Sequence, residues 1–359
     1  MKFRLDFIQA LRGLAAVIIV LFHMTESTFF YFKNVWLYDI FSLGWTSVDF
    51  FFVLSGFIIT YIHFNDLKQQ KNVSSFLVKR FNRIYPVIWI VTLIYFFFAA
   101  ASKRYSFTDI FSSYFFKSLF LLPTAETTLV GVSWSLRYEV MFYIVFAVCI
   151  LLGLKLTKWL VAIWLIAIFS FQLFTVPDIS TMFFDGFACE FLLGSITGYL
   201  FSSYIHQRKQ LQFDNKILLL TGSLLFLGRW LLSYFTSYEG NNAFESRIFY
   251  GSASAILILG AALSDFKSQL KVPALFLLIG DASYVIYLLH SLTLAFLYKS
   301  ATRFLHIQDS DFLTFLFGLF AVVISVLIGI AFHKIVEKPI LKFANKLTFR
   351  YSNNIPKLE

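Results

Sequence analysis

Charged residues are scarce in this sequence: Asp, Glu, Lys and Arg make up 14% of its 359 residues, whereas hydrophobic residues make up 59%. A water-soluble domain of this length has too little interior to hide so much apolar surface. Apolar runs of about twenty residues recur along the chain, which is the length that crosses a bilayer as an α-helix. These features exclude a soluble globular protein and predict an all-α polytopic membrane protein.

Cysteine is also rare. The chain has two, Cys149 and Cys189, and both fall inside apolar runs. Two such cysteines form neither a disulfide framework nor a metal cluster, so we interpret them as small core residues and expect no bound metal. The sequence has no internal repeat, and its loops are too short to fold alone, so we expect one membrane domain over 1–333.

The net charge is +10, which by itself would suit a nucleic-acid partner. Lys and Arg instead fall mainly in the short loops on one side of the predicted spans, which is the orientation signal of a membrane protein. We therefore expect no nucleic-acid partner, a multi-pass protein of the inner (plasma) membrane in contact with its lipids, and both termini in the cytoplasm. About ten transmembrane helices are predicted, at 8–30, 44–63, 84–101, 134–153, 157–175, 182–201, 216–232, 248–264, 273–298 and 312–333.

Two segments do not fit as spans. Residues 107–122 are apolar but short and amphipathic, and Pro123 ends them, so we expect an interfacial or re-entrant helix on the outer side. If they crossed, every later loop would change sides and the charge bias would be lost. The tail at 334–359 carries a basic residue at every fourth position from Lys334 to Arg350, and it predicts a basic amphipathic helix on the inner leaflet.

Arg12 and His23 stand out in the first span. Eleven residues turn an α-helix through about 1100°, so both side chains share one face, and they lie about 16 Å apart along the axis. Ionisable groups at such depth are costly and usually mark a pathway or a site. The alternative is that the histidine only forms hydrogen bonds with a neighbouring helix and that the arginine side chain extends to the lipid headgroups. We expect both to line one water-accessible path.

Other titratable residues recur in the spans, and Asp49 and Glu139 are among those nearer the outer side. Trp134 and Tyr138 are typical interface aromatics, and Tyr143 follows Glu139 by one helical turn. Arg80 and Arg83 are neighbours at the start of a helix, where paired guanidiniums can bind phosphate or serve as ordinary positive-inside charges. Proton-coupled transporters and intramembrane enzymes both carry such sets, so a transporter of a glycolipid or small solute stays open as the alternative.

Several segments together resemble the membrane-bound acyltransferase family 3, integral membrane acyltransferases that modify extracellular sugars. The resemblance rests on motifs in family order: Asp6 with Leu11-Arg12-Gly13 and the eleven-residue step to His23; Val48-Asp49-Phe50 through Ser55-Gly56-Phe57; Arg80-x-x-Arg83-Ile84-Tyr85-Pro86; Leu122-Pro123; Trp134-Ser135-Leu136 with Glu139 and Tyr143; Gly280-x-x-Ser283-Tyr284-x-x-Tyr287-x-x-His290; and Glu337-Lys338-Pro339.

The resemblance implies transfer of an acyl group, usually acetyl, from cytoplasmic acyl-coenzyme A to a hydroxyl of a glycan or glycolipid outside the cell. The family's functional arginine and histidine map onto Arg12 and His23, and its arginine pair onto Arg80 and Arg83. Leu289 stands where the family often has Trp. Many members also carry a soluble domain after the last span, and here we expect transfer to finish within the membrane domain.

These residues suggest a mechanism. Coenzyme A is highly anionic, so Arg80, Arg83 and Arg12 would bind acetyl-CoA at the cytoplasmic rim. His23 would deprotonate the acceptor hydroxyl or take the acyl group itself. Glu139 and Asp49 would assist His23 or bind the sugar. Trp134, Tyr143 and His290 complete the expected substrate-binding set.

Overall fold

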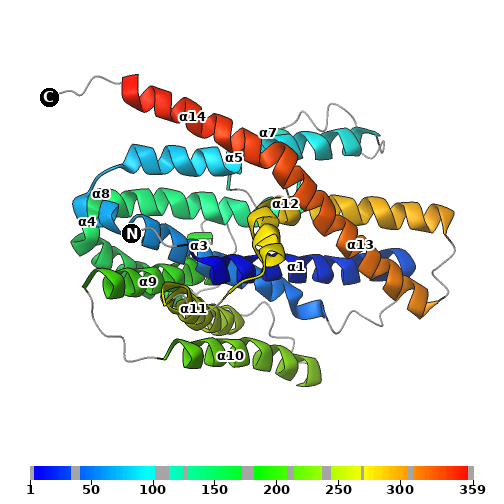
Figure 1. The fold of residues 1–359 in the computed structure, drawn as a ribbon, viewed down its shortest axis with the longest axis horizontal. Helices are drawn as coiled ribbons and strands as arrows, with labels where there is room; N and C mark the ends of the chain where they lie inside the picture. Colours follow the sequence, from blue (N-terminus) through cyan, green and yellow to red (C-terminus); the bar gives the residue numbers. More distant parts are fainter. Residues whose placement is uncertain are drawn as a thin grey trace.

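The computed structural model describes residues 4–33, 41–101, 113–123, 128–171, 182–207, 214–236, 244–267, 271–305 and 310–354. Over these ranges the chain is helical and contains no strand, which confirms the all-α prediction. The helices of the core lie side by side along one direction, as Figure 1 shows. Their bounds are α1 Asp6–Phe32, η1 Ser42–Thr46, α3 Ser47–Ile62, α4 Phe64–Gln69, α5 Val73–Ala101, α7 Ser113–Leu119, η2 Gly131–Ser133, α8 Trp134–Phe171, α9 Gly186–Gln207, α10 Asn215–Thr236, α11 Phe244–Phe266, α12 Ala274–Phe304, α13 Asp311–Phe332, the π-helical turn η5 His333–Glu337, and α14 Lys338–Asn354.

Eight of the described helices are long and apolar enough to cross a membrane, against about ten predicted. The difference lies in α8 and α9. Helix α8 contains the predicted range 134–153 and residues 157–171 of the predicted range 157–175. Helix α9, which covers most of the predicted range 182–201, carries Glu190 and several Ser and Thr residues that lower its hydropathy. Residues 172–181 lie outside the described part of the chain.

Helix α8 is two helices joined at Gly153, whose φ of 74° is accessible to glycine at little cost. The Thr157 hydroxyl donates a hydrogen bond of 2.9 Å to the carbonyl of Cys149, eight residues earlier. In a straight helix eight residues rise about 12 Å, so this bond requires a sharp turn at Gly153. The break between the two predicted ranges is therefore real.

The helices α1, α5 and α12 run parallel to one another. The Gln9 amide donates to Asp281 (2.8 Å) near the start of α1 and α12, and Thr28 lies 2.6 Å from the Tyr298 hydroxyl near their ends. The end of the bundle at which these three helices begin is called the inner end here, and the opposite one the outer end. That the inner end faces the cytoplasm stays a prediction from the charge pattern.

The connection between α5 and α8 is described at 113–123 and 128–133. Helix α8 runs antiparallel to α5, and its first turn lies beside Tyr287, near the middle of α12. Helix α7 of the connection runs back along α5: Phe115 packs against Phe96 at 5.6 Å, and the indole of Trp89 donates to the carbonyl of Leu119 (3.1 Å). Over 113–123 the chain thus turns back toward the inner end, as in the re-entrant alternative of the prediction; residues 102–112 and 124–127 lie outside the described part.

The tail forms the predicted helix. In Figure 1, α14 nearly continues the line of α13 and extends beyond the bundle. The Asn82 amide donates to the carbonyl of Ala344 (3.4 Å), so α14 lies beside the first turns of α5. Its position on the inner leaflet stays a prediction, and residues 355–359 lie outside the described part.

Glycines bring α3 and α9 into close contact, as the small residues Ser55 and Gly56 predict. A Cβ added to Gly56 would overlap the carbonyl oxygen of Phe191, and one added to Gly194 would overlap that of Val53. Both overlaps are with backbone, which cannot rotate away. The two helices therefore pack backbone to backbone.

We expect Gly194→Ala to destabilise the protein by about 2–3 kcal/mol, because the methyl group forces α3 and α9 apart. Thermal unfolding in detergent measures the effect. Gly228→Ala in α10 is the matched control, since a Cβ there meets nothing within 4 Å. Equal unfolding temperatures for the two variants would refute the close packing.

Candidate functional site

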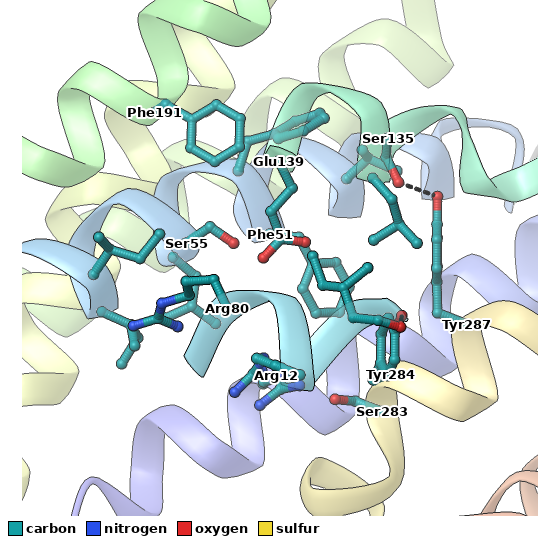
Figure 2. A pocket seen from close by; sticks show the side chains of 18 of the residues that line it. Arg12, Phe51, Ser55, Arg80, Ser135, Glu139, Phe191, Ser283, Tyr284 and Tyr287 are labelled. Carbon is teal, nitrogen blue, oxygen red and sulfur yellow. Dashed lines mark hydrogen bonds between the residues drawn. The ribbon is translucent and has the colours of Figure 1, made fainter. Parts of the chain in front are cut away.

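A pocket of about 280 Å³ lies between α1, α3, α5, α8 and α12 (Figure 2). It brings together most of the residues that the sequence singles out. Its polar lining consists of Gln9, Arg12, Ser55, Arg80, Arg83, Ser135, Glu139, Tyr143, Ser283, Tyr284 and Tyr287. The rest of the wall is apolar, with Phe51 and Phe191 among its members. We call this space the arginine pocket.

Three guanidiniums line this pocket from two helices. Arg80 is 9% exposed, and its guanidinium lies 5.5 Å from the centre of the Tyr143 ring. Its Nε atom has no hydrogen-bond partner among the residues that the structure describes. Arg83 follows one turn later on α5 and is exposed, and Arg12 approaches from α1. A buried donor without a partner, beside two further cations, suits an anionic ligand.

Glu139 supplies the negative charge of the arginine pocket. The Tyr143 hydroxyl donates a hydrogen bond to its carboxylate across one turn of α8. The charges that act on Arg12 include Glu139, Glu337, Asp281 and Arg83. The predicted set Arg12, Arg80, Arg83, Glu139 and Tyr143 therefore converges on one space.

His23 and His290 form a separate pair. Their ring centres are 5.0 Å apart, and neither lies among the described residues that line the arginine pocket. The structure thus places Arg12 on the pocket and His23 outside its described lining, while the ring of the lining residue Tyr287 is 6.0 Å from that of His290. The arginine pocket is therefore not by itself the single path expected for Arg12 and His23.

The surroundings of the two imidazoles fix which nitrogen is available. His23 Nδ1 lies 2.6 Å from a carboxylate oxygen of Glu26, and the ring is 29% exposed. His290 is fully buried, and its Nδ1 lies 3.1 Å from the carbonyl of Ile286, which can only accept. Both rings therefore carry a proton on Nδ1 when neutral, which leaves each Nε2 as an acceptor. Among the described residues, Nε2 of His290 has no partner.

Asp49 lies outside the described lining of the arginine pocket. It is fully buried, forms an ion pair with Arg247 of α11, and interacts with the buried Glu190 of α9. The Arg247 guanidinium lies 4.5 Å from the Trp45 ring and 4.0 Å from the Phe187 ring. The geometry ties α3 to α11 and does not place Asp49 beside His23.

Trp134 packs against the aromatic residues that lie around Arg247. Its ring lies 5.2 Å from Phe187 and 6.2 Å from Phe52, and it is not among the described pocket-lining residues. Among the described residues no group of three metal-ligating side chains comes together.

Sequence reasoning did not single out Glu26, Arg247 or the contacts of Tyr287. Glu26 follows His23 by three residues, and side chains at this spacing on a helix are neighbours, so the sequence could have predicted their contact. The sequence offers no such local indication for Arg247, because its partner Asp49 is 198 residues away. The hydrogen bonds of Tyr287 likewise depend on how α8 and α12 pack.

The chain was compared with known proteins. The profile of a family described as an acyltransferase domain matches residues 5–334. The exopolysaccharide production protein ExoZ of Rhizobium meliloti is 26% identical over 337 residues, which cover 90% of this chain and 95% of that relative. The peptidoglycan O-acetyltransferase OatA of Listeria monocytogenes is 29% identical over 171 residues, 42% of this chain and 25% of that protein. No solved structure matches the chain.

We expect Arg247→Gln to destabilise the protein by about 3–5 kcal/mol, because it leaves the Asp49 charge buried without its partner. The double variant Asp49→Asn with Arg247→Gln should recover much of this loss, since it removes both charges. Thermal unfolding of the single and double variants in detergent measures the coupling. Additive losses would show that the ion pair does not hold α3 to α11.

Proposed function

This chain belongs to the acyltransferase family and is a membrane O-acyltransferase, and on that premise we propose that it moves an acyl group, expected to be acetyl, from acyl-coenzyme A to a hydroxyl of a glycan or glycolipid. One observation carries the proposal: Arg12, Arg80 and Arg83 line a single pocket with Glu139 and Tyr143. Relatives named for exopolysaccharide production and peptidoglycan O-acetylation support a glycan acceptor. Family membership favours the enzyme over the transporter.

The donor is proposed to bind with its phosphates at the inner end. Arg83 is exposed, whereas Arg80 is buried with an unpartnered donor, so one cation of the pair is open to the surface and the other lies inside the pocket. Arginine binds phosphate through two parallel hydrogen bonds, which fixes orientation as well as charge. The pocket of about 280 Å³ suits the uncharged pantetheine arm and a short acyl group. The proposed location is the inner membrane, with the donor on the cytoplasmic side.

His23 is proposed as the general base. With the Nδ1 proton held by Glu26, its Nε2 can take the proton of the acceptor hydroxyl. The hydroxyl oxygen then bonds to the thioester carbon, the carbon–sulfur bond breaks, and the imidazolium returns the proton to the leaving thiolate. Direct transfer of the acyl group onto His23, followed by transfer to the acceptor, uses the same nitrogen. His290, the neighbour of His23, is proposed to accept a hydrogen bond at Nε2 from another hydroxyl of the acceptor.

The remaining predicted residues take supporting roles in this proposal. Glu139, held by Tyr143, faces the guanidiniums and orients Arg12 toward the donor. Asp49 and Trp134 act through the packing of α3, α9 and α11 around Arg247, rather than by direct contact with His23.

We expect Arg80→Ala to weaken acetyl-CoA binding by about ten- to a hundredfold, because a charge-assisted hydrogen bond contributes about 1.5–3 kcal/mol. Calorimetric titration of the purified full chain measures the affinity. Arg229→Ala in α10, a helix that contributes no described residue to the pocket, is the control. Unchanged affinity in Arg80→Ala would remove the donor from this pocket.

We expect His23→Ala to lower acyl transfer by at least about a hundredfold while the protein remains inserted and abundant, because it removes the general base. Mass spectrometry of surface polysaccharide from cells that express each variant measures the added acyl group. His206→Ala in α9 is the matched control, since His206 contacts Phe64 and not the pocket. Retained transfer in His23→Ala would end the assignment.

A further inference from the structure

Tyr287 belongs both to the lining of the arginine pocket and to the surroundings of the histidine pair. It lines the pocket on one side (Figure 2). On the other side the centre of its ring is 6.0 Å from the His290 ring, and His290 is 5.0 Å from His23. Among the described lining residues, Tyr287 is the one whose ring contacts the histidine pair.

Two hydrogen bonds hold this ring in place. The Tyr287 hydroxyl lies 2.7 Å from the carbonyl of Val132 and 2.8 Å from Oγ of Ser135. A carbonyl only accepts, so the single proton of Tyr287 goes to Val132, and Ser135 donates to the phenolic oxygen. Both partners belong to η2 and the first turn of α8, whereas the ring belongs to α12. The hydroxyl is fully engaged, and the ring is fixed across the space between these helices.

The space behind the ring contains an unsatisfied acceptor. His290 is fully buried, its Nδ1 proton is engaged by the carbonyl of Ile286, and Nε2 has no partner among the described residues. A buried polar atom without a partner raises the free energy of the folded state. A hydroxyl group or a water molecule that passes Tyr287 would satisfy it.

We propose that Tyr287 is a gate between the donor pocket and the histidine pair. This inference rests on the proposed function, because the thioester is the group that the gate holds back. While the ring is fixed, the thioester cannot approach His23. When the two hydrogen bonds break and the ring turns, the two spaces join and transfer can proceed.

The gate protects the donor from water. In an open site without acceptor, His23 could activate water in place of the acceptor hydroxyl. Water would add to the acyl carbon, the carbon–sulfur bond would break, and the products would be the carboxylic acid and coenzyme A thiol. While the gate is closed, this hydrolysis of the thioester can occur only after the ring of Tyr287 turns.

The first test measures access to His290 without any donor. Purified full chain in lipid nanodiscs is treated with diethyl pyrocarbonate, and modification of His290 is followed by peptide mass spectrometry. We expect Tyr287→Phe, which loses both bonds, and Ser135→Ala, which loses one, to be modified about tenfold faster than the wild type, because a neutral hydrogen bond is worth about that factor in an opening equilibrium. Ser135→Ala decides the question alone if Tyr287→Phe fails to fold.

Tyr95→Phe is the matched control. The Tyr95 hydroxyl donates to the carbonyl of Leu288 (3.1 Å) on the same helix α12 and is not among the described pocket-lining residues. Its variant should be modified at the wild-type rate. The proposal is overturned if both gate variants match the wild type, or if Tyr95→Phe speeds modification as much as they do.

The second test measures hydrolysis of acetyl-CoA in the absence of acceptor. Tyr287→Phe should release coenzyme A about tenfold faster than the wild type, and Tyr95→Phe should not. The two proposals fail differently. Faster modification of His290 in a protein that binds no acetyl-CoA supports the gate and refutes the donor, whereas wild-type modification rates in variants that still transfer acetyl refute the gate alone.

Discussion

The arrangement of this protein depends on one constraint: a charge inside a helical bundle in lipid needs a counter-charge, a set of hydrogen bonds or a space that water or a ligand can enter. Asp49 meets it through its ion pair with Arg247, and the buried Glu337 through its hydrogen bond with His333, 2.6 Å away. Arg80 meets it only in part, since its Nε is unpartnered among the described residues. The pocket therefore forms where the bundle leaves positive charge uncompensated, and that is where an anionic substrate gains most from binding.

Close packing of α1 against α12 fixes the positions of the polar residues on these two helices relative to one another. A Cβ added to Gly13 would lie 2.8 Å from the backbone nitrogen of Gly280, so the two helices meet almost backbone to backbone at their inner ends. Because the helices are parallel, the register set there continues outward. Tyr284, Tyr287 and His290 then follow one another along α12 on the way from Arg12 to His23. A methyl group at Gly13 would shift this whole series relative to α1.

The sequence predicts the helices and much of the pocket, because apolar length and basic loops are local signals and the arginine and histidine motifs come in family order. It correctly predicts a break between 153 and 157, and the described part of the connection at 102–133 follows the re-entrant alternative. It does not predict which helices pack together. Arg247, 198 residues from Asp49, and the bonds from η2 and α8 to Tyr287 arise only from that packing. For the same reason Arg12 and His23, which share a helix face, do not both line the described pocket.

This separation makes physical sense for a reaction between a highly charged donor and a polar acceptor. The arginine pocket, at about 280 Å³, is small beside a whole coenzyme A, and its cations lie toward the inner end. A donor bound there keeps its phosphates beside Arg83, near water, and only its uncharged arm and thioester enter the low-dielectric interior, where ions are costly. The imidazoles lie farther along α1 and α12, so an acceptor can approach them from the outer end. Each substrate then keeps its polar part near its own side of the membrane, and the acyl group alone has to pass the ring of Tyr287.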